Sequence, residues 1–291
     1  MYLHCAGSAM KSSQNQRGLS MIELLISLAI SSFLIIGITQ VYIDNKRNQV
    51  FQLNQMGNLE GSRFAALVID QYLGKAGYRR NPAALVETAF PSRAAGGDCL
   101  EFKPGHTATG LNPTVGVGFC IRYQPQVSGE LDCQGSSSGV NYTEAFPNSL
   151  SSSDQIILAF KYESGGNTDL EKGRLLCKNL NATAPQYSEL LSGIADIRLE
   201  FGVGNSDALD KEVSTFIPHK DWTANSGAIR SIRYNLLLSS GAKLRDSEDS
   251  LILDKWLTGA PEASKTRLQN ADNRRIYQIA SSTQTLRNLM P

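Results

Sequence analysis

The stretch RGLSMIELLISLAISSFLIIG, residues 17–37, places a single carboxylate, Glu23, at the edge of a long apolar run. Residues 24–43 contain no charged side chain, and roughly 20 such residues in a helix span the hydrocarbon core of a bilayer. A lone carboxylate in hydrocarbon costs on the order of 3 kcal/mol, so Glu23 needs a polar partner or a function there. The preceding residues include Lys11 and Arg17 and no acid, which predicts a cytoplasmic N-terminus ahead of a membrane anchor.

A cut between Gly18 and Leu19 would give Glu23 such a partner. It would create an α-amino group four residues before the carboxylate, within reach of it in space. The carboxylate can pair with this amine in its own chain or with the amine of a neighbouring subunit, and only the second arrangement builds a polymer. The alternative is an ordinary signal anchor in which Gly18 and Glu23 have no special role.

These residues resemble the class III leader of type IV prepilins and pseudopilins. That signal has a basic leader, a glycine, an apolar first mature residue and a glutamate at the fifth mature position, matched here by Gly18, Leu19 and Glu23. The resemblance implies a prepilin peptidase of the inner membrane that cuts after Gly18 and methylates the Leu19 amine. The family usually has Phe where this chain has Leu19. Met10 opens a leader of the usual short length, MKSSQNQRG, so both Met1 and Met10 are candidate start residues.

Composition predicts a folded protein without a strongly charged partner. The 291 residues are 41% hydrophobic, enough for an anchor helix and one or two compact units. Loss of Lys11 and Arg17 with the leader changes the formal charge from +1 to −1. A balance this close to neutral indicates no electrostatic attraction to nucleic acid, which is not an expected partner.

The cysteine count is typical of an exported protein with disulfide bonds. Removal of Cys5 with the leader leaves Cys99, Cys120, Cys133 and Cys177, which form two disulfides in an oxidising periplasm by any of three pairings. We predict the sequential pairing, in which Cys99 bonds Cys120 and Cys133 bonds Cys177. Four buried free thiols are the alternative. The spacing contains no CxxC pair and no neighbouring His, so no metal site is predicted.

The helix is predicted to continue well beyond the apolar run. Gly77 supplies a stop, and a helix from Leu19 to about Ala76 would be roughly 87 Å long at 1.5 Å per residue. Apolar residues recur at helical spacing in its second half and are predicted to pack on the rest of the protein. They are Val50, Leu53, Met56, Phe64, Leu67, Val68 and Tyr72.

From residue 85 onward the pattern predicts β-structure. Short apolar stretches alternate with Gly, Ser, Asn and Pro, and in IRLEF the apolar Ile197, Leu199 and Phe201 alternate with two charged residues, as on a sheet with one wet face. The predicted strands are 98–102, 115–123, 155–162, 174–178, 194–203, 229–239 and 275–281. The Ser-rich stretches 134–139 and 149–154 are predicted surface loops in a variable middle insertion. Together they indicate an α+β fold: a long N-terminal helix packed on a meandering antiparallel sheet.

Later segments resemble the PilW-type minor pilins. They are 61–82 at the junction of helix and head, 190–204 with 229–240 as a central strand pair, and 272–291 as a closing strand. The predicted domains are a cleaved leader (1–18), the transmembrane or filament-core half of the helix (19–45), its amphipathic half (46–80) and a periplasmic β-rich head (81–291).

The resemblance implies a minor pilin that primes type IV pilus assembly and lies at or near the filament tip, supporting piliation, twitching and adhesion. Its implied partners are the prepilin peptidase, other minor pilins, the major pilin and a tip adhesin. The implied location is the inner membrane, crossed once, and then the extracellular pilus. A GspJ-like minor pseudopilin of a type II secretion system is the alternative.

Residues with catalytic chemistry are scattered, and no enzyme activity or cofactor is predicted. His4, His106 and His219 form no HExxH, and the chain has no GxSxG or P-loop pattern. The acidic turn RDSEDS, residues 245–250, lacks EF-hand spacing. A DNA-capturing pilin is a third class, but it needs a basic and aromatic stripe, and the arginine pairs at 79–80 and 274–275 are too short to form one.

Overall fold

A computed structural model describes residues 18, 20–146, 154–204 and 212–289. The chain divides into two compact units, Met1–Val50 and Phe51–Pro291. The second unit, here called the head unit, contains both β-sheets and the C-terminal half of the first helix. Leu19, most of the leader and part of the predicted loop at 149–154 lie outside the described residues.

The first helix, α1, runs from Met21 to Lys75 and ends where the sequence predicts. It contains no proline, and its Leu, Ile, Met and Ala residues favour helix throughout. Gly77 stops it, because its φ of +75° lies in the left-handed region that glycine adopts most readily. The Gly77 N–H donates to the carbonyl of Arg122 at 3.0 Å, which joins the end of the helix to a strand of the head unit.

The face of α1 that packs in the head unit differs from the predicted one. The buried residues of α1 are Asn58, Ser62, Ala65, Ile69 and Leu73. The prediction is wrong for most of the larger apolar residues: Leu53, Met56, Phe64 and Leu67 are exposed, and Val68 is only partly buried. Tyr72 alone of this predicted set makes a ring contact, with Phe160 at 5.4 Å between centroids.

Close approach of the backbone explains this choice of face. Small side chains let α1 lie against the sheets, and a Cβ added at Gly61 would meet Leu238 at 3.2 Å. The Asn58 side chain donates to the Ile276 carbonyl at 3.2 Å, and the Gln278 amide donates to the Ser62 hydroxyl at 3.4 Å. A search for large apolar residues at helical spacing misses such a face, because several of its buried side chains are small or polar.

The head unit contains two antiparallel sheets, where the sequence predicted one. The first is a meander in the order β1 (Ala108–Gly110), β2 (Val117–Tyr123), β3 (Ile156–Glu163), β4 (Arg174–Asn179) and β5 (Ser188–Ser192). The second has the order β7 (Thr215–Pro218), β6 (Ile194–Val203), β8 (Ile229–Lys243) and β9 (Arg275–Thr285). The predicted strand at 98–102 is wrong, because this segment makes only isolated bridges, Cys99 to Leu111 and Arg93 to Phe102.

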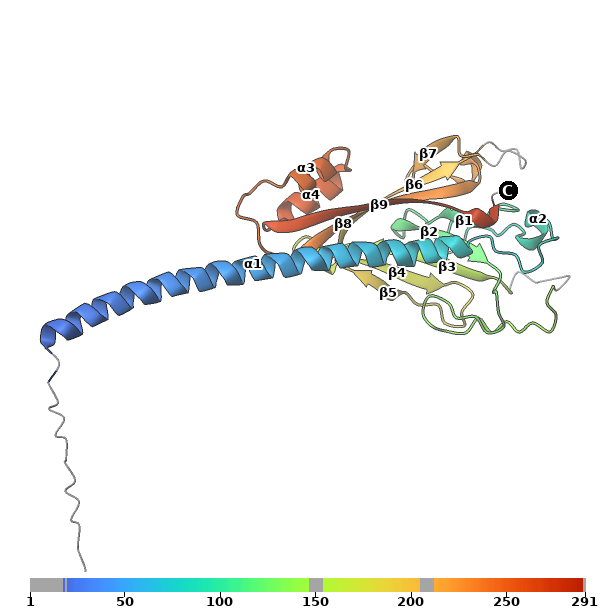
Figure 1. The fold of residues 1–291 in the computed structure, drawn as a ribbon. Coiled ribbons are helices and arrows are strands. Elements are labelled where there is room, and N and C mark those ends of the chain that lie inside the picture. The colour runs from blue at the N-terminus through green and yellow to red at the C-terminus, as the bar shows by residue number, and fades with distance from the viewer. Residues whose placement is uncertain (1–17, 19, 147–153, 205–211, 290–291) are drawn as a thin grey trace, which may run out of the picture. The chain divides into compact units, whose positions relative to one another are not determined.

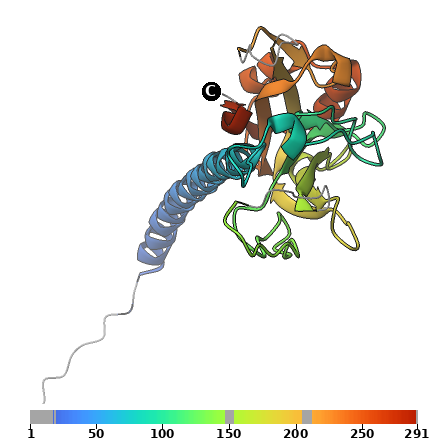
Figure 2. The same cartoon turned by 90° about the vertical axis from the view of Figure 1, so that its right-hand side faces the viewer.

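One hydrophobic core contains residues of α1 and of both sheets. Figures 1 and 2 show the C-terminal part of α1 running beside the strands. In β6 the alternation predicted from IRLEF is confirmed, since Ile197, Leu199 and Phe201 are buried in this core and the two charged residues between them are partly exposed. The far face of the second sheet is covered by α3 (Leu251–Leu257) and α4 (Glu262–Ala271). Short turns of helix complete the head unit: α2 (Val86–Ala89), η2 (Leu170–Lys172), η3 (Ala224–Ser226) and η4 (Arg287–Leu289).

A buried arginine organises the segment that covers the outer face of the first sheet. Arg122 on β2 is 1% exposed, between the rings of Phe90 and Phe102. Its guanidinium donates to four backbone carbonyls, those of Phe90, Pro91, Lys103 and His106, at 2.6–3.2 Å. These bonds join three stretches of the segment, at Phe90 and Pro91, at Lys103 and at His106, to a single side chain on β2.

The last described residues hold the end of α1. The Asn288 amide donates to the carbonyls of Gly74 and Ala76, each at 3.0 Å. Leu286 and Leu289 pack with the same core as α1. The C-terminus of the helix is thus capped by residues more than 200 positions later in the sequence.

Candidate functional site

Glu23 lies in the first turn of α1, where a carboxylate is favoured by the helix dipole. Its side chain turns back and accepts a hydrogen bond from the backbone N–H of Ser20 at 3.3 Å. This is half of a capping box, in which an acid in the first turn satisfies a free amide of the helix start. Gly18 is exposed and has no atom within 4 Å of an added Cβ, and Leu19 lies outside the described residues. The carboxylate therefore contacts the residue that directly follows Leu19.

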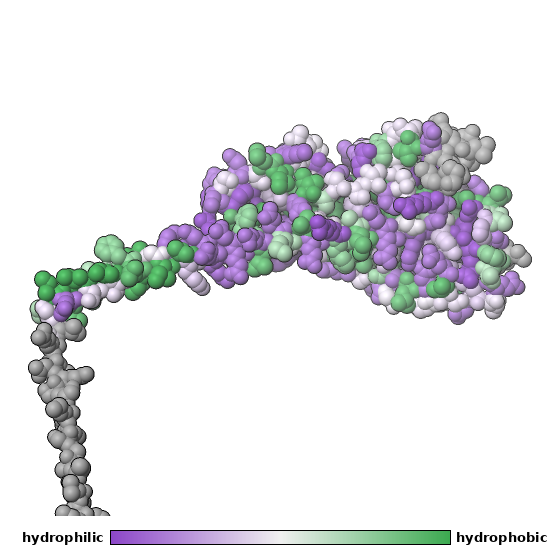
Figure 3. Space-filling model, viewed as in Figure 1, coloured by the Kyte–Doolittle hydropathy of each residue, from purple (hydrophilic) through white to green (hydrophobic). Residues whose placement is uncertain are grey.

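The apolar run of α1 lacks a covering surface among the described residues. Leu24, Phe33 and Ile38 are 56%, 77% and 68% exposed. Figure 3 shows the N-terminal part of α1 as a nearly continuous hydrophobic surface. By length and composition α1 can cross a membrane, and it is the one helix in the described part of the chain that meets this test. Apolar surface on this scale needs lipid or another protein to cover it.

The four cysteines of the head unit form two disulfides. Cys99 bonds Cys120 and Cys133 bonds Cys177, with Cα atoms 6.1 Å and 6.3 Å apart. This is the sequential pairing that the sequence analysis favours over the other two. Each bond fastens a segment without regular strands to a strand: the first fixes the loop around residue 99 to β2, and the second fixes the excursion around residue 133 to β4.

His219, Trp222 and Trp256 are buried in the head unit and His106 is partly buried there, whereas His4 lies outside the described residues. The Gly118 N–H donates to Nε2 of His219 at 3.4 Å, and burial lowers the pKa of this imidazole. Burial likewise lowers the pKa of His106, to about 4, with nearby Lys103 and Arg122 acting in the same direction. Among the described residues, no group of three or more His, Cys, Asp or Glu side chains is placed to hold a metal ion.

The arginine pairs considered for DNA binding make contacts within the chain. In the first pair, Arg79 donates a hydrogen bond to the Ala84 carbonyl, and Arg80 donates one to the Gln126 carbonyl. In the second pair, Arg274 forms an ion pair with Glu248 at 3.0 Å, and Arg275 forms one with Glu171 at 2.7 Å. In the acidic turn, Arg245 pairs with Asp272 at 2.6 Å. These arginine side chains are therefore engaged in contacts within the chain, and the two arginine pairs do not form a continuous basic stripe.

A buried carboxylate on β6 was missed by the sequence analysis. Asp196 is 5% exposed, accepts from the Trp256 indole at 2.8 Å and pairs with Arg267 at 2.8 Å. Burial raises the pKa of this carboxyl, against the hydrogen bond from Trp256 and the charge of Arg267. Because Trp256 is on α3 and Arg267 on α4, Asp196 fixes both helices to the sheet. No local pattern signals this carboxylate, since its partners are 60 or more positions away.

Two parts of the chain match known families. Residues 162–288 match the family described as Type IV Pilus-assembly protein W, and residues 13–39 match the prokaryotic N-terminal methylation motif. A type IV-like pilin from Thermus thermophilus is 13% identical, with 81% of this chain and 98% of that chain covered and a TM-score of 0.41. No curated protein matches the chain significantly.

The motif, the apolar helix that overlaps it and the match at 162–288 support a pilin-like role, with a helix consistent with membrane anchoring before pilus assembly. More particularly, the chain carries a PilW domain, which covers the second sheet, α3 and α4 together with β4 and β5. The methylation motif includes Gly18, Leu19 and Glu23, so the features singled out in the sequence fall within it.

Proposed function

We propose that this protein is a minor pilin that primes the assembly of a type IV pilus and is incorporated at or near its tip. The observation that carries the proposal is Glu23, a carboxylate in the first turn of an apolar helix and inside an N-terminal methylation motif. The PilW domain at 162–288 favours a pilus over a type II secretion system. The protein acts as a structural subunit and supports twitching and adhesion through the presence of pili.

Processing comes first in the proposed sequence of events. The chain crosses the inner membrane once, with its N-terminus in the cytoplasm and its head in the periplasm. The prepilin peptidase cuts between Gly18 and Leu19 and methylates the new amine. The exposed and irregular backbone at Gly18 supports access of a peptidase to this bond.

Assembly then moves the apolar helix from lipid into a bundle of similar helices. The apolar residues of the run at 24–43 stay shielded from water when they move from lipid into the bundle, so the move costs little hydrophobic free energy. Glu23 pairs with the amine of a neighbouring subunit and sets the axial register. An ion pair gains little over its desolvation cost, but an unmatched charge is expensive, so the pair selects register more than it adds strength.

The Ser20 contact supports a role for Glu23 before assembly. The carboxylate accepts a hydrogen bond from the N–H of Ser20, which follows Leu19 in the sequence. Pairing within the chain protects the charge in the membrane. Exchange of this partner for a neighbour's amine, with the other minor pilins, the major pilin or both, is the proposed step of incorporation.

The test is the intact mass and N-terminal sequence of the protein from membranes, with and without the prepilin peptidase. We expect a chain that starts at methylated Leu19 in the presence of the peptidase and an intact leader in its absence. A leader kept in both strains, or a cut beyond the apolar run, would refute the proposal. Sheared filaments from the same cells should contain the protein, whereas secretion by a type II system should not depend on it.

A further inference from the structure

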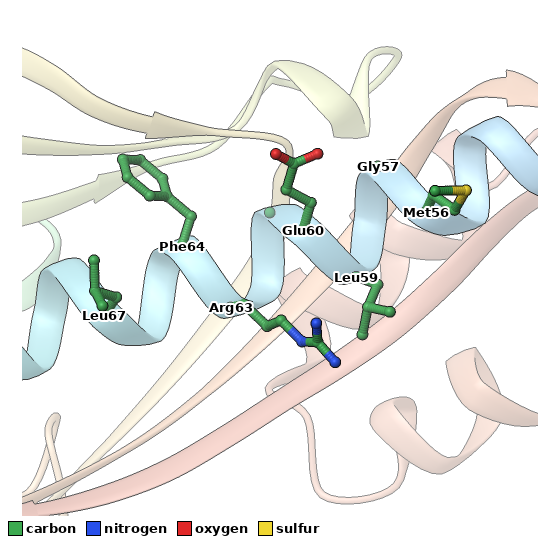
Figure 4. A pocket seen from close by; sticks show the side chains of 8 residues that line it. Met56, Gly57, Leu59, Glu60, Arg63, Phe64 and Leu67 are labelled. Atoms are coloured by element: carbon green, nitrogen blue, oxygen red, sulfur yellow. The ribbon is translucent and has the colours of Figure 1, made fainter.

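Two hollows of the head unit differ in chemistry. The larger, about 880 Å³, lies along α1 and is lined mainly by apolar side chains such as Met56, Phe64 and Leu67 (Figure 4). The smaller, about 120 Å³, is here called the arginine cavity. It is lined by Pro91, Ser92, Arg93, Arg122, Gln155 and Ile157. A lining with two guanidinium groups and no carboxylate is chemically suited to an anion.

Strands of the first sheet form the floor of the arginine cavity. Arg122 on β2 is paired with Ile157 on β3, so their side chains share the outer face of the sheet, and Gln155 directly precedes β3. These three residues are at most 4% exposed. At the rim, Pro91 and Ser92 are exposed and Arg93 is partly exposed. The cavity therefore has a buried, charged floor and an accessible mouth.

The two arginines of the cavity have neutral partners. Among the described residues their guanidinium groups form hydrogen bonds only with uncharged oxygens: Arg93 with the Asn181 side chain at 3.1 Å, and Arg122 with backbone carbonyls. The Asn181 amide donates in turn to the Gln155 carbonyl at 2.7 Å, which fixes Arg93 beside the floor. Three other arginines with side chains at most 14% exposed each have a carboxylate oxygen at 2.6–2.8 Å: Arg245, Arg267 and Arg275.

One N–H group of Arg122 is left for a ligand. A guanidinium has five N–H groups, and four of those of Arg122 donate to carbonyls, one from Nε, one from Nη1 and two from Nη2. The second N–H of Nη1 has no acceptor in the described part of the chain, and the first bonds Pro91 at the rim. Leaving a buried donor unpaired costs free energy, so an acceptor in the cavity would be stabilising.

Electrostatics act in the same direction. Burial, and after it the charge of Arg93, lowers the pKa of the Arg122 guanidinium to about 9. Both causes penalise the charged form of the side chain, and a negative charge next to the two guanidinium groups would oppose them. The arginine cavity therefore favours an anion over a neutral ligand.

The size of the arginine cavity restricts that anion to a small group. Its volume of about 120 Å³ exceeds the roughly 15 Å³ that one water needs but is well below the roughly 300–1,000 Å³ of sites for larger organic ligands. A guanidinium matches the planar carboxylate group in a two-point contact. Because four N–H groups of Arg122 are already used, a single negative charge is matched better than the double charge of a phosphate.

We propose that the arginine cavity binds one carboxylate group, held by Arg93 and by the free N–H of Arg122, with the Ser92 hydroxyl as a further donor at the mouth. The carboxylate belongs to a small free molecule or to an acidic residue of another protein seated at the mouth. The site is part of the head unit and does not require the proposed function, so the two can be tested separately.

The first test is the melting temperature of the full-length protein in detergent as sodium acetate is added. Sodium methanesulfonate at the same ionic strength is the reference, because it has the same charge on a larger, tetrahedral group. At about ten times its dissociation constant, acetate should raise the melting temperature by about 3–5 °C more than methanesulfonate does. Equal responses to the two anions, or no response to acetate, would overturn the proposal.

Variants of Arg93 assign the response to the cavity without disturbing Arg122. Arg93→Gln should abolish the acetate shift, and Arg93→Lys should keep part of it because the charge remains. Arg233→Gln is the matched control, since Arg233 is also partly exposed but lies on β8 and pairs with Glu200 at 3.0 Å. It should leave the acetate shift unchanged. Melting without acetate shows that each variant is folded, and a full acetate shift in Arg93→Gln would refute the assignment.

A photo-crosslinking amino acid in place of Ser92, in the full-length protein in native membranes, identifies the source of the carboxylate. An adduct to an acidic segment of another protein, in a yield lowered about tenfold by Arg93→Gln, would assign it to a protein partner. Acetate selectivity without such an adduct would assign it to a small free molecule. Normal cleavage of the leader without acetate selectivity would overturn the cavity and leave the pilin function standing, whereas a retained leader with acetate selectivity would do the reverse.

Discussion

Two leucines on opposite faces of α1 allow a matched test of how the head unit holds this helix. Leu73 is completely buried, whereas Leu67 is 64% exposed. Leu73→Ala removes three carbons, worth about 2.4 kcal/mol of transfer free energy at about 0.8 kcal/mol each, and leaves a cavity. We expect the free energy of unfolding to fall by about 3–4 kcal/mol. For a unit of this size the melting temperature should fall by about 10 °C.

Leu67→Ala makes the same chemical change on the same helix and should cost less than about 1 kcal/mol, because most of the side chain is already in water. The assay is chemical or thermal unfolding of the detergent-solubilised full-length protein. Trp222 and Trp256 are both buried and report loss of the head structure by fluorescence.

The two variants should differ in the free energy of unfolding. Leu67→Ala should lower it by less than about 1 kcal/mol, whereas Leu73→Ala should lower it by about 3–4 kcal/mol. Equal destabilisation by the two substitutions would refute the assignment of faces. A larger loss from Leu67→Ala would mean that the apolar stripe predicted from the sequence is the packing face after all.

Further predictions concern processing, the buried arginine and pH. Glu23→Ala should be cut after Gly18 as usual but enter pili at least about tenfold less, measured by immunoblot of sheared filaments; normal incorporation would show that Glu23 pairs only within its own chain. Arg122→Met should lower the free energy of unfolding by about 3–5 kcal/mol in denaturant titration, because four hydrogen bonds from one charged side chain are lost together, and a loss under about 1 kcal/mol would contradict that role. The folded-state pKa values of His106, about 4, and His219 lie below the usual value, so their contribution to stability is complete above about pH 6.5 and is lost as the pH falls toward 4. The melting temperature should therefore fall between pH 7 and pH 4, and less steeply in a His106→Asn variant; an unchanged slope would argue against His106.

Local patterns sufficed for much of the fold. The end of α1 follows from Gly77, and the strands from β2 to β9 that have at least six residues follow from runs of apolar and β-branched residues. The short strands β1, β5 and β7 were missed because three to five residues carry too little periodicity. The segment at 98–102 has the composition of a strand, but it crosses the outer face of the first sheet and is held there by the Cys99 disulfide and by Arg122.

The packing face of α1 could not be predicted from hydrophobicity. Asn58 and Ser62 are buried because their hydrogen bonds go to β9, more than 210 positions away, and Ala65 is buried because it is small. Large residues such as Phe64 were assigned inward by the usual rule and lie outside. The rule fails here because the close approach of α1 to the sheets favours small and hydrogen-bonding side chains on the buried face.

The candidate functional residues also include some that the sequence singles out and some that only the fold brings together. Gly18, Leu19 and Glu23 form a short contiguous signal, so the sequence was enough to single them out. Asp196 and its partners are distant in sequence and become neighbours only in the fold. Short-range signals therefore point to processing, and long-range contacts to the architecture of the head unit.

The cap that Asn288 places on the end of α1 has a consequence for the order of folding. The helix is synthesised first, but its buried face is completed by β9 and its last carbonyls are satisfied by a residue near the chain's end. Contacts of such long sequence separation form late and slowly. A chain interrupted before β9 would leave the Asn58 side chain and the Ala76 carbonyl without these partners. The packing of α1 in the head unit is therefore complete only after the residues through Asn288 have been synthesised, and a chain truncated before β9 should be more sensitive to proteases than the full-length protein.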